Sequence, residues 1–316
     1  MEERIRLGVS QCLMGDSVRF DGGHKLDHFI RDTLGAYVDF VPVCPEVECG
    51  LGVPREAMRL EGDVESPRLV TVRTKVDLTD RMLQWADQRV RQLEKEDLCG
   101  FIFKSKSPSS GMERVKVYTD QGMPVMRGVG LFARAFKDHF PLLPVEDEGR
   151  LHDPVLRENF IEGIFALKRW RETLNSKKTI GNLVQFHTAN KLLLLSHGQQ
   201  HYRDMGKLVA QGKGLPAAEL YRRYEVLLLE ALRLKPTVKK HVNVLQHMMG
   251  YFKKVLSPDE KQELLEVISG YYQGLTPLIV PITLFNHYVR KYQEPYLSRQ
   301  TYLNPHPTAL KLRNHV

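Results

Sequence analysis

The sequence predicts a mainly parallel, Rossmann-like α/β domain followed by an all-α domain. Through the first half, short β-branched and aromatic runs alternate with segments of helical periodicity, an order typical of parallel sheets covered by helices. Through the second half, helical periodicity continues almost without interruption. Prolines and an acidic stretch at 146–149 separate the two patterns, so we place the domains at residues 1–147 and 148–316.

Three buried strands are expected to carry the first domain. Alternating apolar residues from Ile5 lead to Cys12, residues 40–43 lead to Cys44, and residues 98–103 end in an aromatic run. Each of these segments is short and bounded by turn residues, as buried strands are.

Helices and one further strand are expected between these strands. Residues 26–34 and 80–96 carry apolar residues at helical spacing, the second with Thr79 as its cap. Residues 69–76 alternate like an edge strand, and a glycine-rich turn leads into a helix within 128–140.

Ligands of open parallel sheets bind beyond the carboxyl ends of the strands. Cys12, Cys44 and Glu46 follow two of the expected strands and the loop 104–111 follows the third, so we expect them to share one rim of the sheet. The loop is rich in hydroxyl groups, and its proline and glycine restrict its shape. By composition alone, an ordinary polar turn is the favoured interpretation of this loop. Cys99 begins its strand and is assigned to the core.

Composition and cysteine usage narrow the class of protein. Hydrophobic residues make up 42% and charged residues 27% of the chain, which indicates a globular protein rather than a disordered or fibrous one. Four cysteines are too few for a disulfide scaffold in 316 residues, so we expect reduced thiols or metal ligands. No apolar run of about 18 residues and no signal-peptide pattern is present, so we expect a cytoplasmic protein without a membrane segment.

The second domain is expected to consist of seven helices. His197 and His201 stand one helical turn apart, but Gly198 weakens the helix there and no glutamate lies between them, so a metal site is not favoured. The expected helices are 154–171, 180–195, 201–211, 216–234, 237–255, 259–270 and 278–292.

Charge is distributed unevenly between the halves. Residues 1–150 contain 22 Lys and Arg against 25 Asp and Glu, whereas residues 151–316 contain 24 against 13, a net charge of +11. Such asymmetry fits an anionic macromolecule as partner, although a solvated basic surface is the plain alternative. Aromatic and basic residues interleave at 221–224, 251–254 and 288–292. Together these segments favour RNA, but an amphipathic helix with inward aromatics explains each one alone.

Four motifs in the first half then suggest a family. The segments 9–15, 19–23, 42–46 and 104–111 together resemble the TudS-like thiouracil desulfidases over roughly residues 5–145. The remainder, above all 187–207, 247–254 and 281–292, is similar to the YbgA-type domain that is often fused to them. The fused form resembles desulfidases that convert 4-thiouridine in tRNA to uridine.

The resemblance implies a 4Fe-4S cluster held by three cysteines, with one iron left open for the sulfur of the thiolated base. By position, Cys12 and Cys44 are two of these ligands, and Ser110 stands where the family has the third cysteine. Serine is a harder and more basic ligand than thiolate, so the cluster should be held less firmly. Cys49 is a candidate substitute, and Ser110 is either native or the product of a Cys-to-Ser exchange.

The same resemblance implies two catalytic residues. Glu46 would activate the attacking water as a general base, or else support the neighbouring ligand, and Ser107 would donate a proton or hydrogen bond to the base. The expected function is therefore iron-sulfur-dependent removal of sulfur from 4-thiouridine in tRNA, with tRNA and not DNA as the partner.

Two alternatives remain open at this point. One is an RNA-binding or accessory protein whose cluster site is disabled by Ser110. The other is an enzyme that uses Cys44 as a nucleophile without a metal, although no histidine stands near Cys44 in the sequence.

Overall fold

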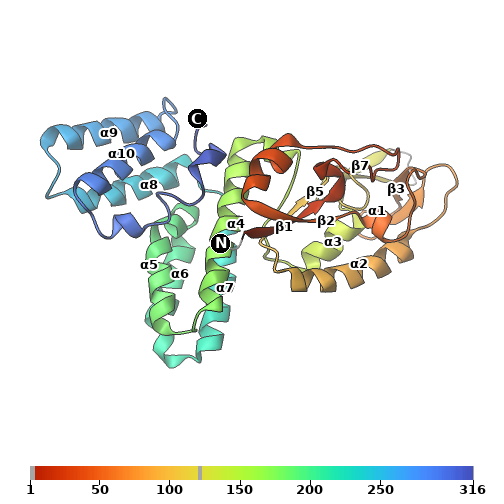
Figure 1. Cartoon of the computed structure of the whole chain (residues 1–316), viewed down its shortest axis with the longest axis horizontal. Helices are drawn as coiled ribbons and strands as arrows, with labels where there is room; N and C mark the ends of the chain where they lie inside the picture. The colour runs from red at the N-terminus through yellow and green to blue at the C-terminus, as the bar shows by residue number, and fades with distance from the viewer. Residues whose placement is uncertain (1–3, 120–122, 316) are drawn as a thin grey trace. The chain divides into compact units, whose positions relative to one another are not determined.

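The computed structural model describes residues 4–119 and 123–315 and divides the chain into two compact units, Met1–Asp153 and Pro154–Val316. Figure 1 shows that the first unit combines strands and helices and that the second is helical. This confirms the predicted α/β and all-α fold classes.

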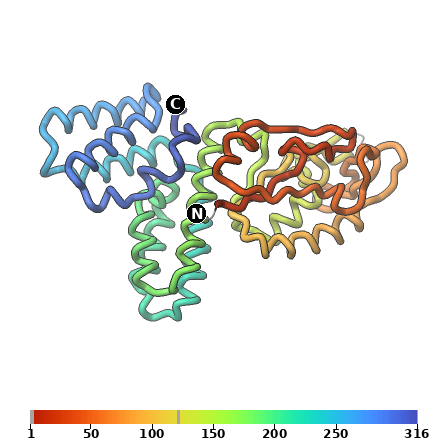
Figure 2. Tube along the Cα trace, in the orientation of Figure 1, coloured from red at the N-terminus to blue at the C-terminus, as the bar shows by residue number. Residues whose placement is uncertain are grey.

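The main sheet of the first unit is parallel, with strand order β2-β1-β5-β8. Its strands come from widely separated parts of the chain, as the trace in Figure 2 shows. The three predicted strands are confirmed; the first and third are shorter than expected, and the second begins two residues earlier, at Val38. The strands are β1 (Ile5–Ser10), β2 (Val38–Val43), β5 (Phe101–Phe103) and β8 (Val145–Asp147).

Strand β8 lies within the acidic stretch that the sequence pattern assigns to a domain boundary. Glu146 and Asp147 are both buried, and burial raises the pKa of each carboxyl. Arg150 Nε donates to Glu146 Oε1 at 2.5 Å, and Arg150 N donates to Asp147 Oδ1 at 2.8 Å. Because these bonds replace the lost hydration, an acidic segment is able to form a buried edge strand.

A second, mixed sheet has the strand order β4-β3-β6-β7. Among the described residues, only one of its strands was expected, and it ends at Thr71 rather than at residue 76; it does lie at a sheet edge. The strands are β3 (Met58–Glu61), β4 (Arg68–Thr71), β6 (Val115–Tyr118) and β7 (Pro124–Gly128).

The helices of the first unit are α1 (Pro45–Glu48), α2 (Thr79–Leu93) and α3 (Leu131–His139). The expected α-helix at 26–34 is instead a short π-helix, Phe29–Thr33, followed by a 3-10 turn. Thr79 is not the cap of α2, because its Oγ1 accepts from Leu69 N at 2.9 Å and donates to Asp77 Oδ1 at 2.5 Å.

An aromatic core joins the main sheet to α3. Phe101 and Phe103 stack at 4.3 Å between ring centroids and pack on Phe132 and Phe136. Trp85 of α2 contacts Phe132 at 5.3 Å. These contacts fix β5 against α3, which places the loop that follows β5.

The second unit contains the seven expected helices, and most of their ends lie within a few residues of the prediction. Its core is built on Trp170, whose ring lies 5.6 Å from Tyr221, 5.1 Å from Tyr224 and 5.1 Å from Phe186. The helices are α4 (Pro154–Asn175), α5 (Ile180–His197), α6 (Gln199–Ala210), α7 (Ala217–Arg233), α8 (Val238–Met249), α9 (Pro258–Tyr272) and α10 (Ile279–Lys291).

Two of the three aromatic-basic segments turn their rings inward. Tyr221 and Tyr224 are core residues, and Tyr288 is buried with its hydroxyl donating to Glu263 at 2.6 Å. Of the rings in the three segments, all of which the structure describes, only that of Tyr251 is exposed, at 47%. The amphipathic-helix interpretation therefore explains segments 221–224 and 288–292.

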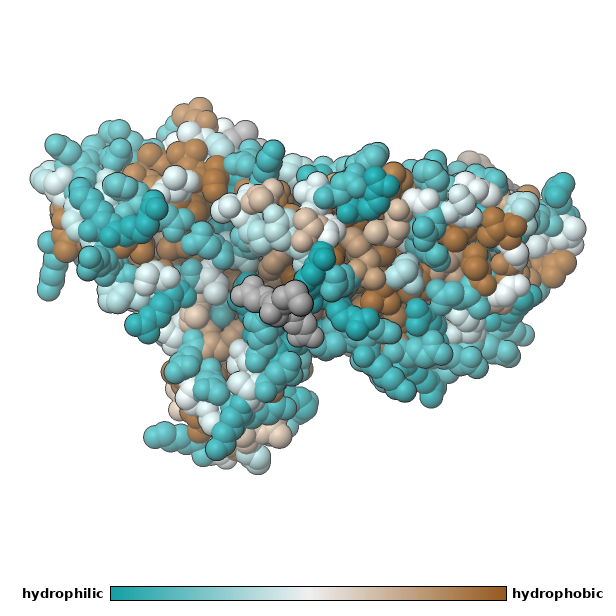
Figure 3. All heavy atoms as spheres, viewed as in Figure 1, coloured by the Kyte–Doolittle hydropathy of each residue, from teal (hydrophilic) through white to brown (hydrophobic). Residues whose placement is uncertain are grey.

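The face in Figure 3 is largely covered by hydrophilic side chains, with hydrophobic ones in scattered patches. Among the residues that the structure describes, no helix has the length and apolar character needed to cross a membrane.

Candidate active site

A single cavity of about 460 Å³ opens where β1, β2 and β5 end. All five residues that the sequence marks as site residues line it or reach its wall: Cys12, Cys44, Glu46, Ser107 and Ser110. Parallel strands end at the same edge of a sheet, so residues far apart in sequence meet there. The structure thus brings the predicted residues together, while the roles assigned to them remain predictions.

The loop after β5 is clamped onto the start of α3. The carbonyl of Ser109 accepts the N-H groups of Phe132 and Ala133 at 2.9 and 3.1 Å, which satisfies two amides that a helix start leaves unpaired. Gly130 makes this close approach possible, because a Cβ there would lie 2.5 Å from the carbonyl carbon and oxygen of Ser109. The loop geometry is therefore set by α3 and not by the loop alone.

Three side chains form a chain of hydrogen bonds at the cavity wall. Ser109 Oγ donates to Glu46 Oε1 at 2.5 Å, and the hydroxyls of Ser107 and Ser109 lie 3.0 Å apart. Ser107 Oγ also accepts the amides of Ser109 and Ser110 at 3.3 and 3.1 Å. Because Ser109 gives its only proton to Glu46, the Ser107 hydroxyl must donate to Ser109. The sequence analysis did not single out Ser109, although it links both predicted catalytic residues.

The second oxygen of Glu46 lies beside Cys44 and Arg55. The Cys44 thiol donates to Glu46 Oε2 at 3.5 Å, and Arg55 Nη2 lies 3.7 Å from the same oxygen. Arg55 is itself anchored by donation to the carbonyls of Val18 at 3.0 Å and Gly52 at 3.2 Å. Arg55 is a second site residue that the sequence analysis missed, since it lies in a loop with no recognisable motif.

Lys104 and Glu148 close the rim between β5 and β8. Lys104 N donates to Ser10 Oγ at 2.8 Å, and Lys104 Nζ forms an ion pair with Glu148. Glu148 also accepts from the Ser105 backbone at 2.7 Å and from its hydroxyl at 2.8 Å. These bonds hold the ends of three strands in register around the cavity.

Burial governs the protonation of the two cavity cysteines. It raises the pKa of Cys12 to about 11 and that of Cys44 to about 12, with the charge of Glu46 adding to the effect at both. Both are therefore neutral thiols near pH 7, and a metal that binds them would displace their protons.

Cys49 and Cys99 do not lie on the cavity wall. Cys49 packs with Leu60, Leu69 and Met82 in a separate apolar cluster, and its thiol donates to the carbonyl of Glu46 at 3.3 Å. Cys99 is buried in the core, as expected. The geometry gives no support to Cys49 as a substitute ligand.

The donor set offers two thiols and one hydroxyl. Ser110 lines the cavity, is only 3% exposed, and has its Oγ 3.5 Å from Ser109 Oγ. In the described part of the chain, no group of three His, Cys, Asp or Glu side chains is arranged to hold a metal ion. Cys12 and Cys44 thus provide two of the three thiols that the resemblance implies for a cluster, and Ser110 provides a hydroxyl oxygen at the third position.

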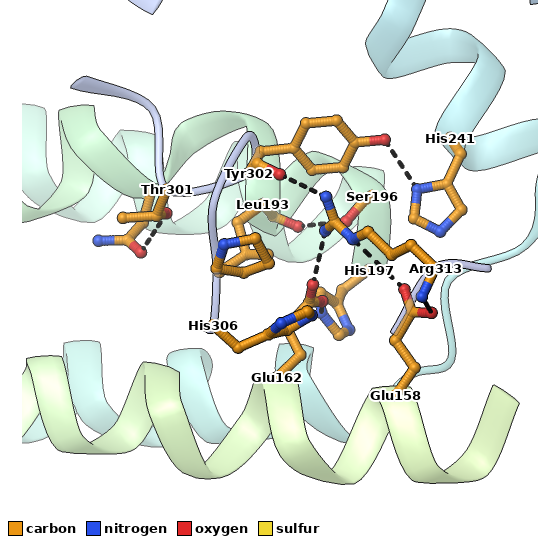
Figure 4. Close-up of polar contacts among 12 residues, drawn as sticks. Glu158, Glu162, Leu193, Ser196, His197, His241, Thr301, Tyr302, His306 and Arg313 are labelled. Carbon is orange, nitrogen blue, oxygen red and sulfur yellow. Dashed lines mark hydrogen bonds and ion pairs between the residues drawn. The ribbon is translucent and has the colours of Figure 1, made fainter. Parts of the chain in front are cut away.

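The helical unit contains a separate buried cluster, shown in Figure 4. Glu162 accepts from Arg313 Nη2 at 2.9 Å and lies 2.7 Å from His197 Nε2, while Arg313 Nη1 donates to the carbonyl of Tyr302 at 2.7 Å. Burial alone would raise the pKa of Glu162, but His197 and Arg313 outweigh it and hold that pKa below its ordinary range.

The same cluster includes His197, which is one of the two histidines, His197 and His201, that stand four residues apart in the sequence. His197 Nδ1 bonds to the carbonyl of Leu234 at 2.6 Å, so both of its ring nitrogens are engaged. Gly198 ends α5, and His201 belongs to α6. The two imidazoles therefore do not form a metal site.

Comparisons with known proteins match the two units to different families. Residues 7–148 match the family model described as 2-thiouracil desulfurase, and residues 191–307 match that of a protein of unknown function, DUF1722. The chain is 32% identical over 154 residues to the uncharacterized protein YbgA of Escherichia coli (strain K12), which covers 48% of this chain and 90% of that protein.

A solved structure also resembles part of the chain. It is that of the [4Fe-4S]-dependent thiouracil desulfidase TudS, which is 26% identical and has a TM-score of 0.40. The match covers 50% of this chain and 100% of the TudS chain.

Proposed function

The chain belongs to the family of YbgA and carries a thiouracil desulfurase domain before it, and from this we propose that it is an iron-sulfur-dependent desulfidase acting on 4-thiouridine in tRNA. The observation that carries the proposal is the convergence of Cys12, Cys44, Glu46, Ser107 and Ser110 on one cavity at the strand ends. Residues that lie almost 100 positions apart in sequence meet there, and all of them except Ser110 are of the type that the motifs imply.

The reaction replaces sulfur by oxygen at C4 of the base. Water adds to the carbon, the carbon-sulfur bond breaks, and uridine and hydrosulfide are released without any oxidant or reductant. A bound 4Fe-4S cluster with an open iron supplies a Lewis acid for the sulfur atom. Cys12, Cys44 and Ser110 are the residues that would hold it.

The protein's own groups manage the protons of this reaction. Glu46 Oε1 is fixed by Ser109, which leaves Oε2 to take the proton of the attacking water. The Ser107 hydroxyl at the cavity wall donates to Ser109, and it would turn its proton from Ser109 to the base when the substrate binds. Lys104 and Arg55, which also line the cavity, provide positive charge for the hydrosulfide that forms.

A tRNA substrate is supported by the charge of the second half. The net charge of +11 in residues 151–316 favours an anionic macromolecule. The rings of segments 221–224 and 288–292 face inward, so they no longer support stacking on RNA bases. The proposed tRNA substrate therefore rests on the positive charge of the second half.

The decisive experiment compares this chain with Ser110→Cys after anaerobic reconstitution. We expect the Cys variant to retain more iron and acid-labile sulfide, because thiolate is the better ligand. Loss of 4-thiouridine absorbance from tRNA should be at least about tenfold faster in that variant. If both proteins hold a cluster and neither consumes 4-thiouridine, the proposal is wrong.

Ser110 also favours a second candidate, an RNA-binding protein without a working cluster. A colourless protein that lacks iron after reconstitution but binds tRNA would support this alternative. Restoration of both iron and activity by Ser110→Cys would show that the site is otherwise intact.

A further inference from the structure

A basic pocket of about 490 Å³ lies between α5 and α6 of the helical unit. His187 and Lys191, one turn apart on α5, face Arg203, Gly206 and Lys207 on α6. The two helices are neighbours in the structure, as Figure 1 shows. The pocket therefore gathers three cations around one buried histidine.

These cations are not neutralised by acids. No Asp or Glu lines the pocket, and within residues 4–119 and 123–315 no ion pair is recorded for Lys191, Arg203 or Lys207. Elsewhere in the unit basic residues do have acidic partners: Arg222 pairs with Glu219 at 3.0 Å. Three unpaired cations around a concave surface attract an anion.

His187 directs a hydrogen-bond donor into this pocket. Its side chain is 3% exposed, Nδ1 lies 3.1 Å from the hydroxyl of Tyr224, and Nε2 has no partner. Tyr224 is fully buried, so its hydroxyl proton must go to Nδ1. The imidazole then carries its own proton on Nε2. Burial and the charge of Lys191 lower the pKa of His187 to about 4, which keeps the ring a neutral donor.

Gly206 lies beside this buried donor at the floor of the pocket. A Cβ at position 206 would lie 3.9 Å from His187 Nε2, an ordinary contact that would fit without strain. A methyl group at this place would crowd an oxygen atom that accepts a hydrogen bond from Nε2. The absence of a side chain at position 206 therefore leaves room beside Nε2 for such an acceptor.

Tyrosines flank the pocket. Tyr202 lines it, and Tyr296 lines an adjoining cavity of about 680 Å³ that shares two residues of α5 with it. Tyr296 stacks on the half-exposed ring of Tyr251, with centroids 4.8 Å apart and planes at 12°. An anion site beside partly exposed aromatic rings fits the phosphate and base of a nucleotide better than a free anion.

We propose that this pocket binds a backbone phosphate of the RNA substrate. His187 Nε2 donates to a phosphate oxygen, Lys191, Arg203 and Lys207 neutralise its charge, and the tyrosines contact an unstacked base. The assignment rests on the proposed function, since it takes tRNA as the partner. The proposed RNA contact therefore lies on α5 and α6 and not on segments 221–224 and 288–292, which the sequence analysis favoured.

The test uses the full chain and four single variants. Gly206→Ala blocks Nε2 without changing charge, and alanine favours a helix over glycine, so the variant should fold. Lys191→Gln and Lys207→Gln each remove one cation from the pocket. Lys239→Gln removes one from an exposed position on α8 and is the matched control.

We expect Gly206→Ala to weaken tRNA binding about tenfold, the loss expected from one charge-assisted hydrogen bond. Each pocket lysine variant should weaken binding and lower the slope of log Kd against log salt by about 1, whereas Lys239→Gln should leave both unchanged. Equal effects of the pocket variants and the control would overturn the assignment, even if tRNA binds tightly.

A second measurement separates the site from the RNA. In spectra of ¹⁵N-histidine-labelled protein, inorganic phosphate and uridine 5′-monophosphate should shift the His187 Nε2-H resonance, and Gly206→Ala should abolish the shift. No shift with either probe would overturn the phosphate site. A shift in a protein that binds no tRNA at any salt concentration would overturn RNA as the source of the phosphate, and with it the proposed tRNA substrate.

Discussion

At the scale of single residues, Ser109 connects the two groups to which catalytic roles are assigned. It donates to Glu46 Oε1 and accepts from Ser107, and it is fully buried. The Glu46 side chain is only 14% exposed, so a carboxylate oxygen that loses its donor there regains only part of that interaction from solvent. Ser109 therefore positions Glu46 and Ser107 relative to each other.

We expect Ser109→Ala and Ser107→Ala each to lower kcat/KM by about 10- to 100-fold in the cluster-loaded Ser110→Cys background. The double variant should lose little more than either single one, because both substitutions break the same chain. Desulfidation kinetics check this, with iron content as the control. If the loss of kcat/KM in the double variant equalled the product of the two single losses, the two hydroxyls would act independently.

Arg313 is the residue whose removal should cost most in the helical unit. Arg313→Met leaves the buried carboxylate of Glu162 without its guanidinium, and breaking such a pair costs about 3–5 kcal/mol. The exposed Arg222, which pairs with Glu219, provides a matched control, because Arg222→Met should remain close to the parent protein. Urea unfolding followed by the fluorescence of Trp170 measures both. Similar losses in the two variants would contradict a special role for the buried cluster.

At the scale of elements, the junction of the catalytic loop with α3 depends on Gly130. The Cβ of Gly130→Ala would meet the carbonyl of Ser109 at 2.5 Å, so the loop or the helix must move. We expect a loss of about 1–3 kcal/mol, the usual cost of overpacking, and faster hydrogen exchange of the Phe132 and Ala133 amides. Gly52→Ala is the control, since its Cβ meets only a carbonyl at 3.9 Å. Unchanged exchange in Gly130→Ala would show that the clamp is unimportant.

Elements with strong apolar periodicity could be predicted from the sequence, and those stabilised by tertiary contacts could not. The seven helices of the second unit and strands β1, β2 and β5 follow their patterns. Strand β8 could not be predicted, because its acidic residues have the composition of a linker. They are buried in a strand only because Arg150 forms hydrogen bonds with them. Most of the second sheet was missed because its strands are only four or five residues long, which is too short for their alternation to stand out from the surrounding chain.

The residues of the candidate active site, too, could be predicted from the sequence only in part. Cys12, Cys44, Glu46, Ser107 and Ser110 could be placed at one rim because strand ends of a parallel sheet meet. Ser109 and Arg55 could not, since their roles arise from bonds to Glu46 across long stretches of chain. His187 was named only as part of a resembling segment, and its unpartnered Nε2 becomes visible only when α6 is packed against α5.

At the scale of the whole molecule, the two units should respond differently to acid. Burial lowers the pKa of His187 and His306 to about 4 and that of His241 to about 3. The unfolded chain binds these protons near pH 6.5, so the helical unit loses stability as the pH falls from 6.5 towards 4, by about 1.4 kcal/mol for each unit of pKa difference. Glu158, whose pKa burial raises to about 7, opposes this as a single group.

Each unit holds one of the two tryptophans, so the units can be followed separately. In Trp85→Phe, the urea midpoint reported by Trp170 should fall clearly between pH 7 and pH 5. In Trp170→Phe, the midpoint reported by Trp85 should fall less, because burial raises the pKa of Glu146 and Asp147 and favours their protonated forms. An equal or larger fall at Trp85 would contradict this assignment.

The late position of β8 has a consequence for the order of events during synthesis. Strand β5 pairs with β8 along its whole length, from Phe101 opposite Val145 to Phe103 opposite Asp147. Until residues 145–147 have left the ribosome, the apolar edge of β5 has no partner on that side, and an unpaired edge is open to association with other chains. The nascent chain therefore stays exposed for more than 40 residues after β5 has emerged, and a chaperone that binds apolar strands would find its target in that interval.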